Sequence, residues 1–368
     1  MVDFVIPTDY AGASRNKAIG VLVIVGLTAV FFLWISLSPL KNEVDRGPNP
    51  GPGDVDLYNA EIKRMQAGEG FYAVCAEELR TRGYPTRSVF NWRTPAPLAI
   101  VGCLPDARLG NALLGVCGLA MAGLAYGWMC RELGRGLAVL GMLALTGVLV
   151  GATGEGFVMT ELWSGVLVAL SVAAYAQQRP RLGVVAGLAA LFCRELAAPY
   201  CLLCLAMAAW ERRWREAAVW LAGFVAYAAY YAIHLSWVLP LIRPDDLTHH
   251  HSWLAYGGGP FVLSTAQMNA YLLEKPQWLT ALLLPIALVG AASWSTPGGT
   301  RLGLTVAGYA LAFDFVGLPF NVYWGLMISP LLAIATVRGI AAIDDLLRAV
   351  RRLPRRQILA GAASAAVG

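Results

Sequence analysis

Long apolar segments follow one another along the chain, and polar residues gather in the connections between them. A helix that crosses a bilayer needs about 20 mainly apolar residues. The pattern predicts ten helices, at residues 18–40, 108–130, 136–152, 160–177, 181–193, 196–211, 216–240, 277–295, 302–318 and 322–340. We therefore expect an all-α polytopic membrane protein with about ten transmembrane helices, built as a single integral membrane domain over residues 1–368.

The composition agrees with this prediction. Hydrophobic residues make up 58% of the chain and charged residues only 14%, whereas soluble domains carry about 25% charged residues. The first apolar run, Ala18 to Leu40, is longer than the core of a signal peptide and lacks a clear small-residue cleavage site. We expect it to be retained as the first helix.

Basic residues recur in alternate connections of this arrangement. With a cytoplasmic N-terminus, every inner segment is basic, as the positive-inside rule requires. These segments contain Arg131 and Arg135, Arg179 and Arg181, Arg212, Arg213 and Arg215, Arg301, and the tail "LLRAVRRLPRRQ". The sequence therefore predicts a protein of the bacterial inner membrane with both termini in the cytoplasm and a basic tail at residues 341–368. Nucleic-acid binding is not expected, because these residues sort by membrane side and do not alternate with stacking aromatics.

The opposite side carries two long outer loops, at residues 41–107 and 241–276, and the short segment "GLPFNVYWG". After the irregular stretch "RGPNPGPGD", apolar residues recur at the spacing of a helix with one apolar face: Val55, Leu57, Tyr58, Ile62 and Met65. We expect an amphipathic juxtamembrane helix there, ended by "GEG" at residues 68–70 and followed by a second helical stretch.

Residues 17–104 carry a resemblance to a known family. An outward-ending first helix, a G-D-x-x-x-Y motif, a juxtamembrane helix and a proline-containing segment together resemble the glycosyltransferase C superfamily. This superfamily includes protein O-mannosyltransferases, the aminoarabinose transferase of lipid A and related polyprenol-dependent mannosyltransferases. The matching residues are Gly53, Asp54, Tyr58, Ala60, Arg64, Gly68 and Tyr72, with "FNWRTPAPLAIVG" at residues 90–102. The motif is short, the resemblance covers residues 17–104, and beyond them only the arrangement of helices is similar.

The resemblance implies transfer of a sugar from a polyprenyl-phosphate donor to an acceptor hydroxyl on the periplasmic side, with a single carboxylate accepting the proton and inversion at the sugar. Many relatives have a second acid directly after the aspartate, whereas here Val55 intervenes and Asp56 follows. Which of the two acids is the base is left open, and alignment on Gly53 and Tyr58 favours Asp54. The donor sugar and the acceptor are not indicated.

A metal at the two aspartates is not favoured. On a helix, Asp54 and Asp56 point about 200° apart, whereas in an extended segment they would share a face and form a D-x-D cation site. The implied donor carries a single phosphate, so no cofactor and no metal are expected.

The leaving phosphate needs a cation. Arg194, in "ALFCRELAAPY", interrupts an apolar stretch in which a charge costs about 2.5–3.5 kcal/mol on insertion scales. It either faces a substrate cavity or ends a short helix and pairs with Glu195 or Glu161. Arg93 either lines the same cavity or extends to the interface beside Trp92.

The second outer loop adds further candidates. Arg243 and His250 are candidates for binding the donor phosphate, and Trp253 for stacking on a sugar ring. The three consecutive histidines 249–251 do not have the spacing of zinc ligands. Asp314, inside a predicted span, is expected to pair with Arg93 or Arg194, or else to lie hydrated near the end of its helix. The expected substrate cavity thus contains Tyr58, Glu161, Glu195, Asp314 and Trp253.

A second function class stays open. A transporter or flippase for a lipid or polar solute would also place Arg194, Glu195 and Asp314 along a path through the membrane. Such proteins are often built from two similar halves, and the sequence shows no internal repeat. The expected partners are the lipid bilayer, a polyprenyl-phosphate-linked sugar and an unidentified acceptor.

Overall fold

The computed structural model describes residues 6–38, 53–152, 154–248 and 256–352, and these residues form helices joined by loops, with no strand among them. All ten predicted apolar segments contain helix. Their bounds are α1 Arg15–Leu37, α5 Ala107–Glu132, α6 Arg135–Leu149, α7 Thr160–Ala176, α8 Pro180–Cys193, α9 Ala198–Trp210, α10 Trp214–Val238, α13 Gln277–Ala292, α14 Pro297–Phe315 and α15 Ser329–Arg351. The all-α class is confirmed for this part of the chain.

Fewer than ten helices are long enough to be clear membrane spans. Within the described residues three qualify by length and apolar character, namely α1, α5 and α10 with its short continuation to Leu241. A fourth span results if η6 Pro319–Met327 and α15 are counted together across their 65° bend. Helices α6, α7, α8 and α13 are apolar but have 14 to 17 residues. The structure therefore suggests a membrane protein without confirming ten spans.

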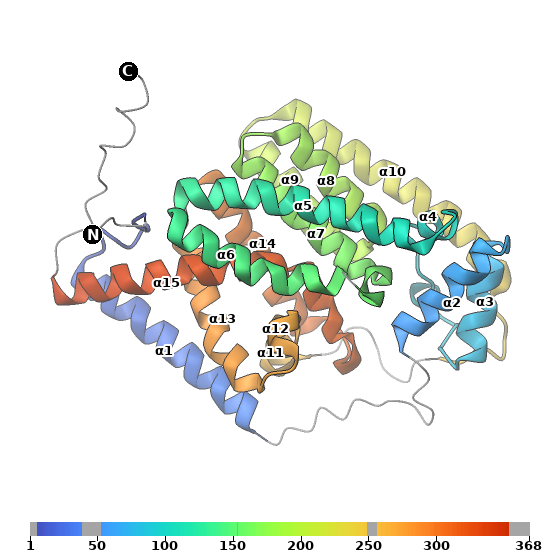
Figure 1. The fold of residues 1–368 in the computed structure, drawn as a ribbon, viewed down its shortest axis with the longest axis horizontal. Coiled ribbons are helices and arrows are strands. Elements are labelled where there is room, and N and C mark those ends of the chain that lie inside the picture. The colour runs from blue at the N-terminus through green and yellow to red at the C-terminus, as the bar shows by residue number, and fades with distance from the viewer. Residues whose placement is uncertain (1–5, 39–52, 153, 249–255, 353–368) are drawn as a thin grey trace.

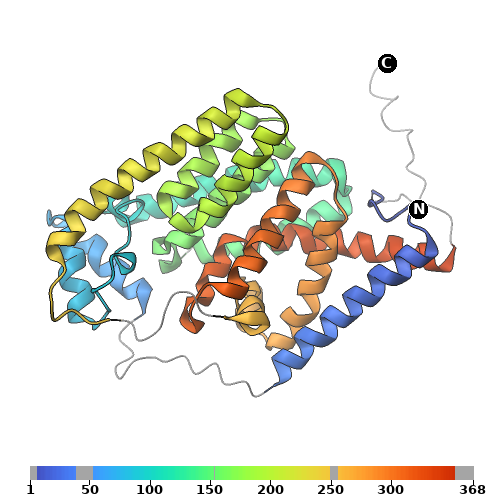
Figure 2. The same ribbon diagram turned by 180° about the vertical axis from the view of Figure 1, so that it is seen from behind.

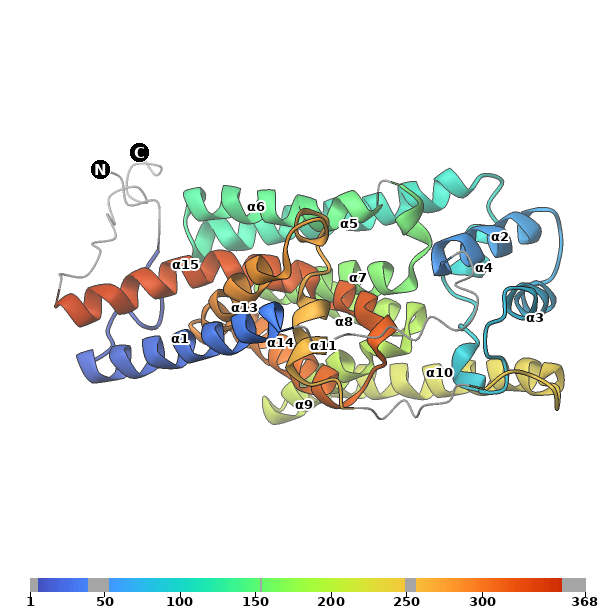
Figure 3. The ribbon, with the colours of Figure 1, turned by 90° about the horizontal axis from the view of Figure 1, so that it is seen from below.

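The short helix α7 lies at the centre of the fold. All of its residues are buried, and it contacts α5 on one side and α8 on the other. Figure 3 shows α5 and α6 as one layer, α7 and α8 beneath it, and α10 on the far side. Helices α1, α13 and α15 pack together in the other half of the molecule (Figure 2). A helix enclosed in this way is screened from lipid by its neighbours, so its length need not match a bilayer.

Small residues allow α13 and α15 to approach closely. A Cβ atom at Gly290 would collide with the carbonyl oxygen of Ala335, and one at Gly339 would collide with that of Ile286. Membrane helices commonly use such small-residue contacts, because apolar side chains gain little by leaving lipid for protein.

The last helix begins and ends later than the sequence pattern predicts. The first residues of the predicted segment 322–340 belong to η6, and the bend after it precedes Pro330 in the first turn of α15. Helix α15 then continues to Arg351, well into the predicted cytoplasmic tail. Asp345 is buried there, and its Oδ2 atom accepts a hydrogen bond from the backbone N–H of Thr8 at 2.7 Å.

The first outer loop folds into a small helical layer at one end of the molecule, where α3 lies beside the end of α10 (Figure 1 and Figure 3). It contains α2 Asp54–Gln66, α3 Phe71–Thr81, η1 Val89–Asn91 and α4 Leu98–Gly102. The amphipathic pattern of α2 is confirmed, with Leu57, Tyr58 and Ile62 buried. Its position in the plane of a membrane interface stays a prediction.

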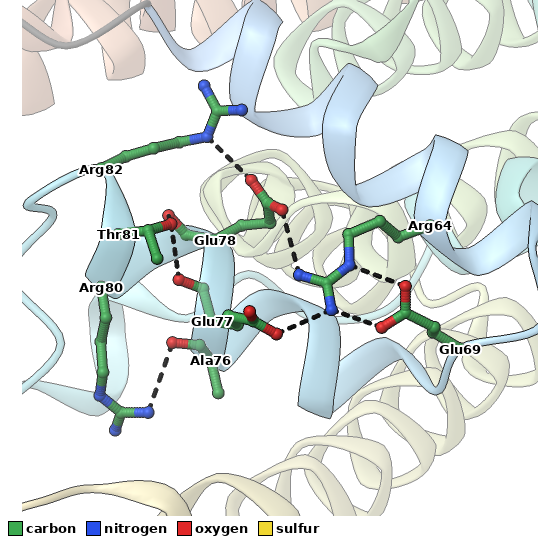
Figure 4. A network of polar contacts seen from close by, with 8 residues as sticks. All are labelled: Arg64, Glu69, Ala76, Glu77, Glu78, Arg80, Thr81 and Arg82. Atoms are coloured by element: carbon green, nitrogen blue, oxygen red, sulfur yellow. Dashed lines mark hydrogen bonds and ion pairs between the residues drawn. The ribbon is translucent and has the colours of Figure 1, made fainter.

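Arg64 ties α2 to α3 (Figure 4). Its guanidinium group bonds Glu69, Glu77 and Glu78, the last two at 2.8 and 3.1 Å, and Glu78 also accepts a bond from Arg82 at 3.0 Å. Arg64 thus joins α2 to α3 and to the turn between them.

The second outer loop also contains packed structure. Helix α11 Gly258–Ala266 contacts α1, α14 and η6. Gly258 has a φ of +56°, and a Cβ at Gly259 would meet the side chains of Ile35 and Phe31 in α1. Gly259 therefore allows α11 to pack closely on α1.

Candidate functional site

The two aspartates of the first outer loop have different surroundings. Asp54 is the first residue of α2 and is half-buried, and its Oδ1 atom accepts a hydrogen bond from the Tyr84 hydroxyl at 2.8 Å. Asp56 is exposed, and its side chain makes no hydrogen bond or ion pair with another described residue. Helical geometry separates the two carboxylates, so they do not form a joint D-x-D site in this structure.

Arg93 lies in the same cluster, held by two tyrosines. Its Nε atom donates to the Tyr58 hydroxyl at 3.0 Å, and its Nη2 atom donates to the Tyr323 hydroxyl at 3.2 Å. No carboxylate of a described residue lies within salt-bridge distance of it. Burial raises the pKa of Tyr58 well above its usual value, so this phenol stays neutral. Arg93 is thus a half-buried cation whose described hydrogen-bond partners are uncharged hydroxyls.

Electrostatic interactions join Asp54 and Arg93 into one site. Tyr58 interacts with the charges of Arg93, Asp54 and Glu161, and Tyr323 interacts with the same three groups. The cluster therefore brings together α2, the segment before α4, the start of α7 and η6, which are far apart in the sequence.

Arg194 lies deeper and is paired with two carboxylates. It follows the last residue of α8, and its Nη1 atom lies 2.6 Å from Oε1 of Glu195. Its Nε atom lies 2.8 Å from Oε1 of Glu161, which stands in the first turn of α7. The Nε–H bond is not aligned with that oxygen, so this contact is an ion pair without a well-formed hydrogen bond. Glu161 is completely buried, while Glu195 keeps 42% of its side chain exposed.

Arg194 and Arg93 therefore differ in the kind of partner that they bind. Arg194 shows the pairing with Glu161 and Glu195 that the sequence leaves open, and its charge is compensated. Arg93 points into the cluster, away from the interface position beside Trp92, which is itself buried and donates its Nε1–H to the carbonyl of Thr86. Of the two, Arg93 forms no ion pair with a described residue, although Glu161 and Glu195 also act on its charge electrostatically.

Glu61 belongs to this region and is not found by motif analysis. It is 2% exposed, on the buried face of α2 one turn after Tyr58, and interacts with Cys75 of α3 and with Arg93. Burial raises its pKa from 4.5 to about 7. The available signal is periodicity, since Leu57, Tyr58, Glu61 and Ile62 share one helix face.

Tyr84, Asn321 and Tyr323 are also additions to the predicted set. Tyr84 bonds Asp54, and the Asn321 side-chain amide donates to the Tyr323 hydroxyl at 3.3 Å. The last two stand in "GLPFNVYWG", a segment that the sequence marks as outer but whose polar residues carry no recognisable motif.

Other predicted residues do not join the cluster. Arg243 is exposed and follows the C-terminal end of α10. Its backbone N–H donates to the Asp246 carboxylate, and its side chain makes no hydrogen bond with another described residue. Asp314 is half-buried one residue before the end of α14, which is the second of the two positions expected for it, and it forms no ion pair with Arg93 or Arg194. His250 and Trp253 lie outside the described residues.

No group of three or more histidine, cysteine, aspartate or glutamate side chains suited to a metal occurs among the described residues. No family model, no curated protein and no solved structure matches the chain. The glycosyltransferase resemblance therefore depends on the motif residues alone.

Proposed function

We propose that the chain is an integral membrane glycosyltransferase that moves a sugar from a polyprenyl-phosphate donor to an acceptor hydroxyl, with Asp54 as the base. The observation that supports this proposal is that one cluster contains a carboxylate and an arginine that forms no ion pair with a described residue. Asp54 is held by Tyr84, Arg93 is held by Tyr58 and Tyr323, and Tyr58 interacts with both charges.

Each charge has a role in the reaction. As the acceptor oxygen attacks the anomeric carbon, its proton passes to the Asp54 carboxylate. The bond from that carbon to the donor phosphate breaks on the opposite face, so the sugar is inverted. Negative charge grows on the leaving phosphate, and the guanidinium of Arg93 stabilises it. One base and one cation are sufficient for this displacement.

The buried pair formed by Arg194 and Glu161 lies next to the proposed site and stabilises the protein around it. Because Arg194 is compensated by two carboxylates, it is a weaker candidate than Arg93 for binding phosphate. It positions Glu195, whose exposed carboxylate faces the substrate region. Asp56 is turned to solvent and has no role in the proposed chemistry.

The proposal includes a place in the cell. The site lies at the end of the molecule formed by α2, α3 and α4 (Figure 1), and the arginine-rich connections assign the opposite side to the cytoplasm. We therefore place the site on the periplasmic side of a bacterial inner membrane, with both termini in the cytoplasm and no metal required.

Transport is the competing function, and the buried triad of Glu161, Arg194 and Glu195 is the observation that favours it. Charged groups at membrane depth often mark a transport path. The charges of the triad compensate one another, whereas the carboxylate of Asp54 and the cation of Arg93 match the two charges that sugar transfer needs.

The test is sugar transfer in membranes that contain the chain, against matched membranes without it. Radiolabelled polyprenyl-phosphate sugars are offered, and the label is followed from the lipid phase into any glycosylated product. The proposal expects transfer that depends on the protein. Labelled lipid that only changes leaflet, with no new glycosidic bond, would instead support the flippase.

A further inference from the structure

One face of α10 carries a row of aromatic rings. Tyr227, Tyr231 and His234 stand at helical spacings of four and three residues, so their side chains share one side of the helix. Ring centroids are 6.3 Å apart for Tyr227 and Tyr231 and 5.7 Å apart for Tyr231 and His234. Tyr72 of α3 extends the row, stacked at 5.8 Å on Trp237.

This aromatic row faces Glu195. Tyr227, Tyr231 and His234 each interact electrostatically with its carboxylate. Glu195 keeps 42% of its side chain exposed, so its carboxylate is open to a ligand. We call the space bordered by this carboxylate and the three rings the recess. The recess thus has aromatic walls and an accessible acid.

Two polar atoms on the wall lack a hydrogen-bond partner among the described residues. The Tyr227 hydroxyl oxygen is buried and unpaired, and so is Nε2 of His234, whose side chain is 1% exposed. The other ring nitrogen of His234 lies 3.2 Å from the Tyr72 hydroxyl. The Trp92 backbone lies near the imidazole, but it makes no well-aligned bond to Nε2. Buried polar groups are rarely left unsatisfied, so these two atoms indicate a ligand or water that completes them.

We infer that this recess binds a neutral pyranose ring of the acceptor. The C–H face of such a ring packs on the electron-rich faces of aromatic side chains, and its hydroxyls donate to a carboxylate and exchange hydrogen bonds with a phenol. Glu195, Tyr227 and His234 provide these groups. Anions are disfavoured here, because Arg194 is already compensated by Glu161 and Glu195.

The inference rests on the proposed function for the role of the bound ring, because only a glycosyltransferase would present it to Asp54. Sugar binding itself is a separate property. Small-molecule sites are usually lined by apolar and aromatic side chains, with a small number of polar groups that converge on the ligand.

The binding test uses the full chain in lipid nanodiscs and saturation-transfer NMR with methyl α-D-mannopyranoside and methyl β-D-glucopyranoside. Tyr227→Phe and Glu195→Gln are compared with Tyr126→Phe, which alters an exposed tyrosine on α5. Tyr227→Phe removes only an unpaired hydroxyl, so folding should be preserved. We expect at least one glycoside to bind, and each wall variant to weaken binding by about tenfold, the usual effect of one lost hydrogen bond to a charged or buried group.

Two results would overturn the inference: no saturation transfer beyond that of empty nanodiscs, or equal binding by both wall variants and Tyr126→Phe. The transfer assay separates this failure from failure of the proposed function. Glycoside binding that depends on Tyr227 and Glu195, without sugar transfer from any donor, supports the recess and contradicts the enzyme. Transfer with an acceptor KM unchanged in both wall variants supports the enzyme and contradicts the recess.

Discussion

Nε of Arg194 lies 2.8 Å from Oε1 of Glu161, and neither side chain is more than 3% exposed. The pair joins the end of α8 to the start of α7 inside the protein. A buried charge that loses its partner is costly, whereas removing both charges of a pair is often tolerated.

Arg194→Gln should therefore destabilise the protein by about 3–5 kcal/mol, because it leaves the Glu161 carboxylate buried without a counter-charge. The double variant Glu161→Gln with Arg194→Gln should recover much of that loss. Thermal unfolding in detergent measures both. Arg348→Gln is the matched control, since its pair with Asp344 is 39% exposed on each side and should cost about 1 kcal/mol or less. Additive losses in the double variant would show that the two charges are not coupled.

Arg93 should be essential for transfer, and Arg243 should not. Arg93→Gln removes the cation held by Tyr58 and Tyr323 and should lower the rate by about a hundredfold or more, the usual cost of one group that stabilises developing charge. Arg93→Lys should rescue little, because an ammonium cannot span both hydroxyls. Initial rates at saturating donor provide the comparison. An Arg93→Gln enzyme with normal activity would remove this residue from the mechanism, and a loss in Arg243→Gln would place the phosphate elsewhere.

Glu61 should make stability depend on pH. Burial raises its pKa in the folded protein from 4.5 to about 7, so the unfolded chain releases this proton at lower pH than the folded one. Its contribution to stability should fall as pH rises from about 4.5 to 7, by roughly 3 kcal/mol at about 1.4 kcal/mol per pKa unit, and stay low above that.

Glu61→Gln imitates the protonated side chain and should remove this fall. Its unfolding temperature should exceed that of the wild type at pH 8 and match it near pH 5. Glu77→Gln, a change at a carboxylate that is 62% exposed, should leave the pH dependence as it is. Parallel curves for Glu61→Gln and the wild type would mean that Glu61 ionises normally in the folded protein.

The close contact of α13 and α15 should tolerate no added methyl group. In Gly290→Ala or Gly339→Ala the new Cβ would meet a backbone carbonyl, which cannot move without separating the helices. We expect each change to destabilise the protein by about 1–3 kcal/mol or more, as overpacking does. Gly123→Ala on α5 has open space around it and serves as the control. Size-exclusion profiles and unfolding temperatures measure the effect. A Gly290→Ala protein as stable as the wild type would disprove the close contact between α13 and α15.

The sequence predicts helix positions well because apolar periodicity is local. The pattern predicts a helix at residues 160–177, and α7 spans Thr160–Ala176. Membrane topology is harder to predict from the sequence, because the enclosed helix α7 and the exposed helix α1 have similarly apolar sequences. The hydrophobic pattern does not predict the bend before α15, because the segments on both sides of the bend are apolar.

The site was predictable only in part, for a similar reason. Asp54, Tyr58, Arg93, Glu161, Arg194 and Glu195 were singled out as charges or motif residues in apolar surroundings, and the structure brings them together. Tyr323 and Tyr84 reach the site through the path of the backbone, which no local pattern encodes. The sequence leaves two positions open for Asp314, and the structure shows the second, near the end of its helix and without an ion pair to Arg93 or Arg194, because charge alone does not specify which partner is within reach.

The most direct test of the account is the comparison of Asp54→Asn with Asp56→Asn. Both changes remove one negative charge from the first turn of α2, so any effect on the helix itself is shared. Each protein is purified, its fold is checked by thermal unfolding, and transfer of labelled sugar from the polyprenyl-phosphate donor is measured. The account predicts that Asp54→Asn lowers the rate by at least about a hundredfold, in line with loss of a general base, while Asp56→Asn keeps nearly the wild-type rate. Normal transfer by Asp54→Asn would contradict it.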